Sequence, residues 1–172
     1  MKPKTLTITI IVFLVVIGLF IWGRANQKST IASLPGTDGT SIIKSALVAS
    51  ETLHDFGTIS MKNGNVDKEF TLTNPTSVDI TISSVATSCM CTTAFIVGSD
   101  GVTKGPFGMP SHGTLVPPAN KVLKAGEELI VRVVYDPNAH GPAGVGPIDR
   151  FITITEKTGD TLELKIKGLV TP

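Results

Sequence analysis

Aromatic side chains are scarce in this chain of 172 residues, where Phe, Trp and Tyr together account for 5%. Charge of neither sign is in excess, because 15 Lys and Arg stand against 14 Asp and Glu. Proteins that bind nucleic acid usually present a basic surface or an aromatic stacking platform. The composition therefore does not favour a nucleic-acid partner, and we expect none.

The sequence motifs of common enzyme classes are also missing. The chain contains no Gly-x-Ser-x-Gly, no Walker sequence, no HExxH and no dinucleotide-binding fingerprint. His54 and Asp55 are adjacent, but neighbouring residues on a strand point to opposite faces, so we do not expect an acid–base pair. We predict that the protein is not an enzyme.

One long apolar run lies near the N-terminus, from Leu6 to Trp22, with Lys2 and Lys4 before it and Arg24 after it. As a helix it would reach about 25 Å, slightly short of the ~30 Å hydrocarbon core of a bilayer. Small residues follow it at the spacing of a cleavage site, although the run is longer than that of most signal peptides. We expect residues 1–24 to form a membrane anchor or an uncleaved signal.

The rest of the chain divides into a linker and one folded domain. Residues 25–50 are rich in Ser, Thr, Gly and Ala, as flexible linkers are. Over residues 51–172, apolar and polar side chains alternate with period two, which is typical of half-buried strands. In TLELKIKGLV, for example, Leu162, Leu164 and Ile166 share one face. We predict an all-β, immunoglobulin-like β-sandwich of about seven strands, preceded by one N-terminal transmembrane helix.

Two further stretches refine this prediction. In VDITIS, the side chains of Val78, Ile80 and Ile82 fall on one face of the predicted strand. The segment from Glu127 to Asp136 is apolar on both faces, which predicts a central strand. Turn sequences such as KNGN, NPT, KAGE and TGD separate the strands at short intervals.

Five segments follow one another in an order that resembles a known family. They are HDFGTI (His54 to Ile59), FTLTNPTS (Phe70 to Ser77), TSCMCTT (Thr87 to Thr93), KAGEELIVRVVYDP (Lys124 to Pro137) and ELKIKGLV (Glu163 to Val170). This order resembles the DUF1573 family, bacterial domains related to the ASH and major-sperm-protein-like β-sandwiches. The resemblance covers roughly residues 51–172 and implies a fold without implying an activity. In the family the cysteine pair usually takes the form Cys-Gly-Cys-Thr, whereas Met90 replaces the glycine here.

The chain has two cysteines, Cys89 and Cys91, separated by Met90. Three alternatives are open: a local disulfide, a soft-metal site, or small apolar side chains that fill space. On a continuous strand their Cα atoms would lie on one face about 6.6 Å apart. That distance is near the upper limit for a disulfide, and it would also let both thiolates reach one metal ion.

Two loops rich in glycine and proline offer further soft ligands. One contains Met109 and His112, and the other contains His140. Thiolate, thioether and imidazole together form the ligand set that Cu(I) prefers. We therefore hypothesise a copper-like metal site formed by Cys89, Cys91, Met109, His112 and His140, with Cu(I) as its cofactor.

These patterns predict a membrane-tethered, extracytoplasmic binding or structural module in the cell membrane. Its partner would be another envelope protein, bound through loops or by pairing with an exposed sheet edge. Phe107 and Met109 would either form an exposed apolar tip or fold back over the edge of the sandwich. The alternative function is a soft-metal or thiol-redox protein that uses Cys89 and Cys91.

Overall fold

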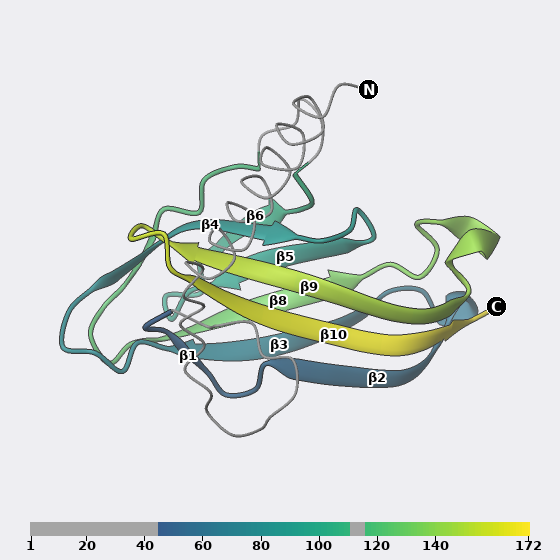
Figure 1. The fold of residues 1–172 in the computed structure, drawn as a ribbon, viewed down its shortest axis with the longest axis horizontal. Helices are drawn as coiled ribbons and strands as arrows, with labels where there is room; N and C mark the ends of the chain where they lie inside the picture. Colours follow the sequence, from purple (N-terminus) through teal and green to yellow (C-terminus); the bar gives the residue numbers. More distant parts are fainter. Residues whose placement is uncertain (1–44, 111–115) are drawn as a thin grey trace, which may run out of the picture. The chain divides into compact units, whose positions relative to one another are not determined.

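The computed structural model describes residues 45–110 and 116–172. In this part of the chain the regular elements are β-strands and two short 3₁₀ helices (Figure 1). The predicted all-β class is confirmed. The predicted transmembrane helix, within residues 1–24, lies outside the described residues. In the described part of the chain, no helix is long and apolar enough to cross a membrane.

In residues 45–110 and 116–172, ten strands form two sheets of five strands each. The first sheet has the order β1-β3-β8-β5-β6. Its strands are β1 (Val48–Ala49), β3 (Val66–Thr73), β8 (Glu128–Tyr135), β5 (Thr92–Val97) and β6 (Thr103–Phe107). The second sheet has the order β2-β10-β9-β4-β7. Its strands are β2 (Leu53–Ser60), β10 (Thr161–Thr171), β9 (Gly146–Glu156), β4 (Ile80–Thr87) and β7 (Lys121–Leu123).

Neighbouring strands are antiparallel except for β2 and β10, which run parallel. The chain leaves β1 at one edge of the first sheet and continues into β2 at one edge of the second (Figure 1). The 3₁₀ helices are η1 (Met61–Asn63), between β2 and β3, and η2 (Gly141–Gly144), between β8 and β9. Two sheets of this kind around one core form a β-sandwich.

The core lies between the sheets and takes side chains from both of them. In β10, Leu162, Leu164 and Ile166 are each at most 2% exposed, so the predicted inward face is confirmed. The apolar strand β8 lies between β3 and β5, in the central position that its sequence predicts. The prediction for Val78 is wrong, because Val78 is 64% exposed and β4 begins only at Ile80.

Asn74 explains why the strand starts late. Its side chain is fully buried, and its amide donates to the carbonyl oxygens of Val78, Leu123 and Lys124 at 2.8, 3.0 and 3.1 Å. Its side-chain oxygen accepts hydrogen bonds from the N–H and the hydroxyl of Thr76. The carbonyl of Val78 is therefore part of the turn after β3 and not of a strand ladder.

The segment that follows β5 adds a strand, β6, to the first sheet. β6 pairs with β5 in a hairpin and forms the edge of that sheet. Phe107 ends β6 and is 1% exposed, whereas Met109 is 37% exposed. The sequence left two alternatives for Phe107, an exposed apolar tip or a ring that folds back over the edge of the sandwich. The ring folds back, because it packs in the core.

The sandwich begins before residue 51. Leu47 is buried in the core, just ahead of β1. The buried carboxylate of Glu156 accepts hydrogen bonds from the hydroxyl of Ser45 and from the N–H groups of Ala46 and Leu47. The last residues of the segment predicted as a linker are thus bound to the domain.

We expect Asn74→Ala to lower the free energy of unfolding by about 2–3 kcal/mol, because several buried polar groups lose their partner. Thr76→Val removes one hydroxyl at the same turn, and we expect it to cost no more than about 1 kcal/mol. Urea unfolding of both variants measures the two losses. Equal losses would contradict the central role of the Asn74 amide.

Candidate functional site

The two cysteines lie in a tight turn where the chain passes from one sheet to the other. β4 of the second sheet ends at Thr87, and β5 of the first sheet begins at Thr92. The N–H of Thr92 donates to the carbonyl oxygen of Cys89 at 3.1 Å and closes the turn. Cys89 and Cys91 therefore do not lie on a continuous strand, because residues 88–91 form the turn by which the chain passes from β4 to β5.

The sulfur atoms of Cys89 and Cys91 are joined in a disulfide. The Cα atoms of the two residues are 5.3 Å apart, closer than the about 6.6 Å expected along a strand, because the turn bends the backbone. The N–H of Cys91 also donates to Sγ of Cys89 at 3.3 Å. Of the three alternatives left open by the sequence, the local disulfide is the state present in the structure.

The two sulfur atoms have different surroundings. Cys91 is 2% exposed, and its Sγ accepts a hydrogen bond from Nε of Arg150 at 3.2 Å. The hydroxyl of Thr92 lies 3.7 Å from the same sulfur. Cys89 is half-buried, and its Sγ lies 3.3 Å from Nε2 of the exposed His140. One sulfur is therefore enclosed beside a guanidinium group, and the other is accessible beside an imidazole.

Backbone hydrogen bonds hold these side chains in place. The N–H of Asp136, at the end of β8, donates to the carbonyl oxygen of Cys91 at 2.9 Å. This bond ties the connection between β8 and β9, which carries His140, to the cysteine turn. Two hydrogen bonds of 2.9 Å join Phe151 on β9 to Ser88 in the cysteine turn: the N–H of Ser88 donates to the carbonyl oxygen of Phe151, and the N–H of Phe151 donates to the hydroxyl of Ser88. These bonds place Arg150, the residue before Phe151, beside the turn.

Tyr135 belongs to the same end of the sandwich, because it pairs with Thr92 across β8 and β5. Burial raises the pKa of its phenol above the usual range, and the charge of Arg150 opposes only part of that effect. The phenol therefore stays protonated near neutral pH and is not a base for the neighbouring sulfur atoms.

The structure brings three of the five hypothesised metal ligands together. The ligand atoms of Cys89, Cys91 and His140 all lie within 4.8 Å of one another. The sulfur of a cysteine binds a metal ion as a thiolate, so the disulfide must be reduced before this group can act as a metal site. Metal binding itself stays a prediction.

Of the other two hypothesised ligands, only Met109 lies in the described residues. Met109 follows Gly108, whose carbonyl oxygen accepts a hydrogen bond from the N–H of Thr87 at 3.1 Å. That bond brings the backbone of this loop to the end of β4, but in the described residues no hydrogen bond joins the side chain of Met109 to a cysteine. His112 lies outside the described residues.

Arg150 is the residue of this site that the sequence did not reveal. It follows Asp149 on a strand, where an adjacent pair of opposite charges indicates an ordinary solvated surface. Only the position of β9 beside the cysteine turn gives it a role. No spacing in the sequence could have shown this contact, because Cys91 lies in the turn before β5 and Arg150 lies on β9, far along the chain.

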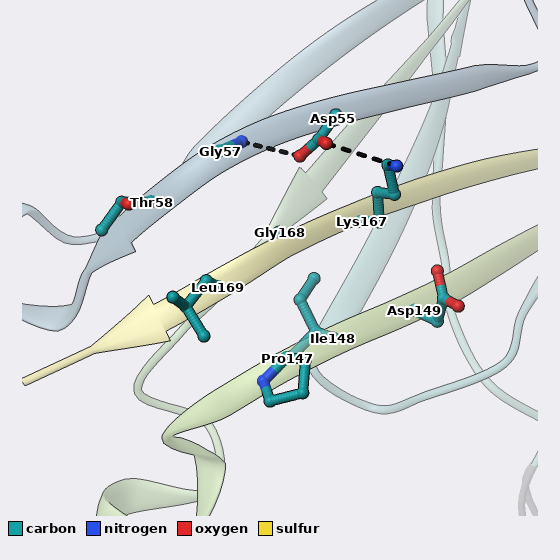
Figure 2. A pocket seen from close by; sticks show the side chains of 9 residues that line it. All are labelled: Asp55, Gly57, Thr58, Pro147, Ile148, Asp149, Lys167, Gly168 and Leu169. Atoms are coloured by element: carbon teal, nitrogen blue, oxygen red, sulfur yellow. Dashed lines mark hydrogen bonds and ion pairs between the residues drawn. The ribbon is translucent and has the colours of Figure 1, made fainter.

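A second feature is an open hollow of about 650 Å³ that spans β2, β10 and β9 (Figure 2). Its charged side chains form ion pairs, Lys167 with Asp55 at 3.3 Å and Lys165 with Asp149 at 2.9 Å. Exposed ion pairs of this kind contribute little to stability. The hollow therefore presents mixed, balanced charge at the edge of the second sheet.

The edge strand β2 bends at this hollow. Its register against β10 shifts between Lys167 and Leu169, opposite Gly57, which has a φ of +64°. The N–H of Gly57 donates to the carboxylate of Asp55 at 2.8 Å (Figure 2). This hydrogen bond is the largest cause that lowers the pKa of Asp55; desolvation opposes it in part, and the nearby Lys167 lowers the pKa further.

Comparison with known proteins finds one family model that matches part of this chain. Residues 47–102 match the family described as "Protein of unknown function (DUF1573)". The resemblance to DUF1573 is confirmed. The matched segment runs from the start of the sandwich through the cysteine turn and β5. His140 and Arg150, the two polar neighbours of the disulfide, lie beyond the DUF1573 match.

Two solved structures align with this chain at low sequence identity. A protein of unknown function from Porphyromonas gingivalis W83 aligns with a TM-score of 0.51 and 18% identity, over 72% of this chain. This chain spans 46% of the length of that protein. An ASH / PapD-like domain of human CEP192 aligns with a TM-score of 0.46 and 13% identity, over 81% of this chain and 95% of that one. No curated protein matches the chain.

We expect Asp55 to titrate below the usual range of an aspartate in ¹³C NMR spectra. Because its pKa is lowered in the folded state, its contribution to stability is complete above the unfolded-state pKa and is lost as the pH falls through the folded-state pKa. Lys167→Met should raise the pKa only in part, because the hydrogen bond from Gly57 remains. A full return to the usual value would contradict this assignment.

Proposed function

We propose that this chain is a non-enzymatic binding module, held at the outer face of a membrane by its N-terminal segment. The observation that supports it is the position of β2. In the described part of the chain β2 pairs with β10 alone, so its other side forms an open edge of the second sheet. Exposed edges bind partner proteins by adding a strand.

The first half of β2 has the geometry that such pairing needs. The carbonyl oxygen of Thr52 accepts a hydrogen bond from the N–H of Lys165 at 2.7 Å, so this group faces β10. Backbone groups alternate in direction along a strand, and those of the next residue, Leu53, therefore point outward. Leu53 is also 46% exposed and offers an apolar contact.

The bend at Gly57 limits this edge. A bulge twists the strand and ends the flat ladder that another chain could extend. Asp55 also occupies the N–H of Gly57 with its own carboxylate. A partner strand would therefore pair only near Leu53 to Asp55, which favours one specific partner over indiscriminate edge-to-edge association.

Two observations support a location outside the cytoplasm. The uncharged run from Leu6 to Trp22 is long enough to hold the chain in a membrane with slight thinning of the bilayer. The disulfide between Cys89 and Cys91 belongs to a class of bond that persists mainly in oxidising compartments. The partner would then be another protein of the cell envelope.

The edge can be tested by photo-cross-linking in cells that produce the full chain, with a photoreactive residue in place of the exposed Thr52. Leu53→Pro removes an outward N–H, whereas Leu53→Ala removes only the side chain. We expect Leu53→Pro to reduce the adduct with an envelope protein by about ten-fold, the equivalent of one lost hydrogen bond. Leu53→Ala should retain more of the adduct.

A control position for the cross-linker is Val122, which is 47% exposed on β7 at the opposite edge of the same sheet. It should give no adduct with that protein. Thermal melting establishes that Leu53→Pro is folded. Equal adduct yields from Leu53→Pro and Leu53→Ala, or the same adduct from Val122, would rule out pairing at this edge.

Soft-metal binding is a second candidate function, favoured by the grouping of Cys89, Cys91 and His140. After reduction, two thiolates and one imidazole would converge on one point, and this ligand set suits Cu(I). The chain itself would supply the ligands and their orientation. The bond from the N–H of Asp136 to the carbonyl of Cys91 would help to keep the turn in place.

We expect the reduced full chain to bind one Cu(I) in competition with a chromogenic Cu(I) chelator. His140→Ala should weaken binding by about ten-fold or more, because one of the ligands is lost. His54→Ala is the matched control, since that ring packs against Phe56 with a centroid distance of 4.7 Å. Met109→Leu and His112→Ala test the two remaining ligands. Binding that survives Cys89→Ser together with Cys91→Ser would eliminate the site.

A further inference from the structure

We propose that the Cys89–Cys91 disulfide is redox-active and exchanges with thiols in one direction, with Cys89 as the sulfur that is attacked and Cys91 as the sulfur that leaves. This inference rests on the turn described above. It requires neither copper nor a partner at β2. The substrate class is a thiol, either a small molecule or an accessible cysteine of another protein.

The position of the disulfide in the chain argues against a purely structural role. Its cysteines are two residues apart, and the stabilisation that a cross-link gives by restricting the unfolded chain grows with the length of the loop it closes. The turn is also closed by hydrogen bonds from Thr92 to Cys89 and from Asp136 to Cys91. The fold therefore gains little from this bond.

Accessibility selects the sulfur that is attacked. Cys91 is 2% exposed, whereas Cys89 is half-buried between two exposed neighbours, Met90 at 69% exposure and His140. Exchange requires a thiolate to approach one sulfur of the disulfide directly. Only Cys89 offers such an approach.

The charge of Arg150 selects the sulfur that leaves. Its Nε–H donates to Sγ of Cys91 at 3.2 Å, and one terminal nitrogen donates to the carbonyl of Asp149 at 2.8 Å. Arg150 takes part in none of the ion pairs in the described part of the chain. A half-buried cation without a counter-charge stabilises an anion that forms beside it, and a stabilised thiolate is the better leaving group.

The exchange is balanced as follows. A thiolate attacks Sγ of Cys89, a new S–S bond forms there, and the Cys89–Cys91 bond breaks with its electron pair passing to Sγ of Cys91. A second thiolate then attacks the sulfur of the bound thiol, which releases Cys89 and forms the external disulfide. Two thiols are oxidised, the protein disulfide is reduced to a dithiol, and the two protons lost by the thiols balance the two taken up by the cysteines.

His140 can assist the second step. Its Nε2 lies 3.3 Å from Sγ of Cys89, so a protonated imidazole can donate to that sulfur as it is released. Arg150 and His140 therefore act on different sulfur atoms and at different stages.

Reduced glutathione added to the oxidised full chain, followed by acid quenching and peptide mass analysis, tests the direction. We expect the glutathione adduct on Cys89 and not on Cys91. Arg150→Met should slow reduction by about ten-fold or more, because the leaving thiolate loses its cation. Arg150→Lys should restore part of the rate. The matched control is Arg132→Met, since Arg132 lies on β8 over the ring of Phe95 at 5.5 Å.

Thermal melting of each variant, and of Cys89→Ser with Cys91→Ser, separates loss of exchange from loss of fold. An adduct on Cys91, a parent-like rate in Arg150→Met, or reduction that occurs only in denaturant would overturn the proposal. These outcomes are independent of the cross-linking and copper experiments. Failure of exchange thus leaves the proposed binding functions standing, and the reverse also holds.

Discussion

The passage of the chain from the second sheet to the first, between Thr87 and Thr92, is the constraint on which the rest of the site depends. Both threonines are buried, and the hydroxyl of Thr87 donates to the carbonyl oxygens of Cys89 and Thr92 at 3.1 and 2.9 Å. So short a crossing leaves no room for a loop. The backbone must turn at once, which brings both sulfur atoms together and encloses that of Cys91 between the sheets.

The sequence predicts those parts of the fold that depend on local alternation. Leu164 and Ile166 are buried where period two places them, and β8 is central because its sequence is apolar on both faces. The number of strands could not be predicted as well. β1 has two residues and β7 has three, so neither is long enough to show a recognisable alternation of apolar and polar residues. Each is a strand because it pairs with a longer one, β1 with β3 and β7 with β4. The prediction that Val78 lies on the buried face of a strand is wrong because the side-chain amide of Asn74 donates a hydrogen bond to the carbonyl oxygen of Val78.

The site was predictable in its residue types and not in its geometry. Cys89 and Cys91 stand out because they are the two cysteines of the chain and lie one residue apart. His140 stands out because the segment around it is rich in glycine and proline, which predicts a loop. The change of sheets was invisible, because from Val85 to Cys91 every second residue is less exposed than its neighbours, so the period-two pattern of a strand continues through the turn. The contact between Arg150 and Cys91 could not be predicted for a related reason. The register of β9 in its sheet places Arg150 beside the cysteine turn, and the distance between the two residues in the sequence does not.

Strand β9 connects the two surfaces of interest. Asp149 is exposed and lines the hollow at the edge of the second sheet, whereas Arg150 turns to the cysteine turn, because adjacent residues on a strand face opposite sides. Asp149 already has Lys165 as its counter-charge, so it does not neutralise Arg150. Among the described residues, the guanidinium in the disulfide state therefore donates only to neutral acceptors, Sγ of Cys91 and the carbonyl oxygen of Asp149. Breaking the disulfide would supply the missing anion at Cys91, so this arrangement of charges favours the reduced state more than a neutral pocket would.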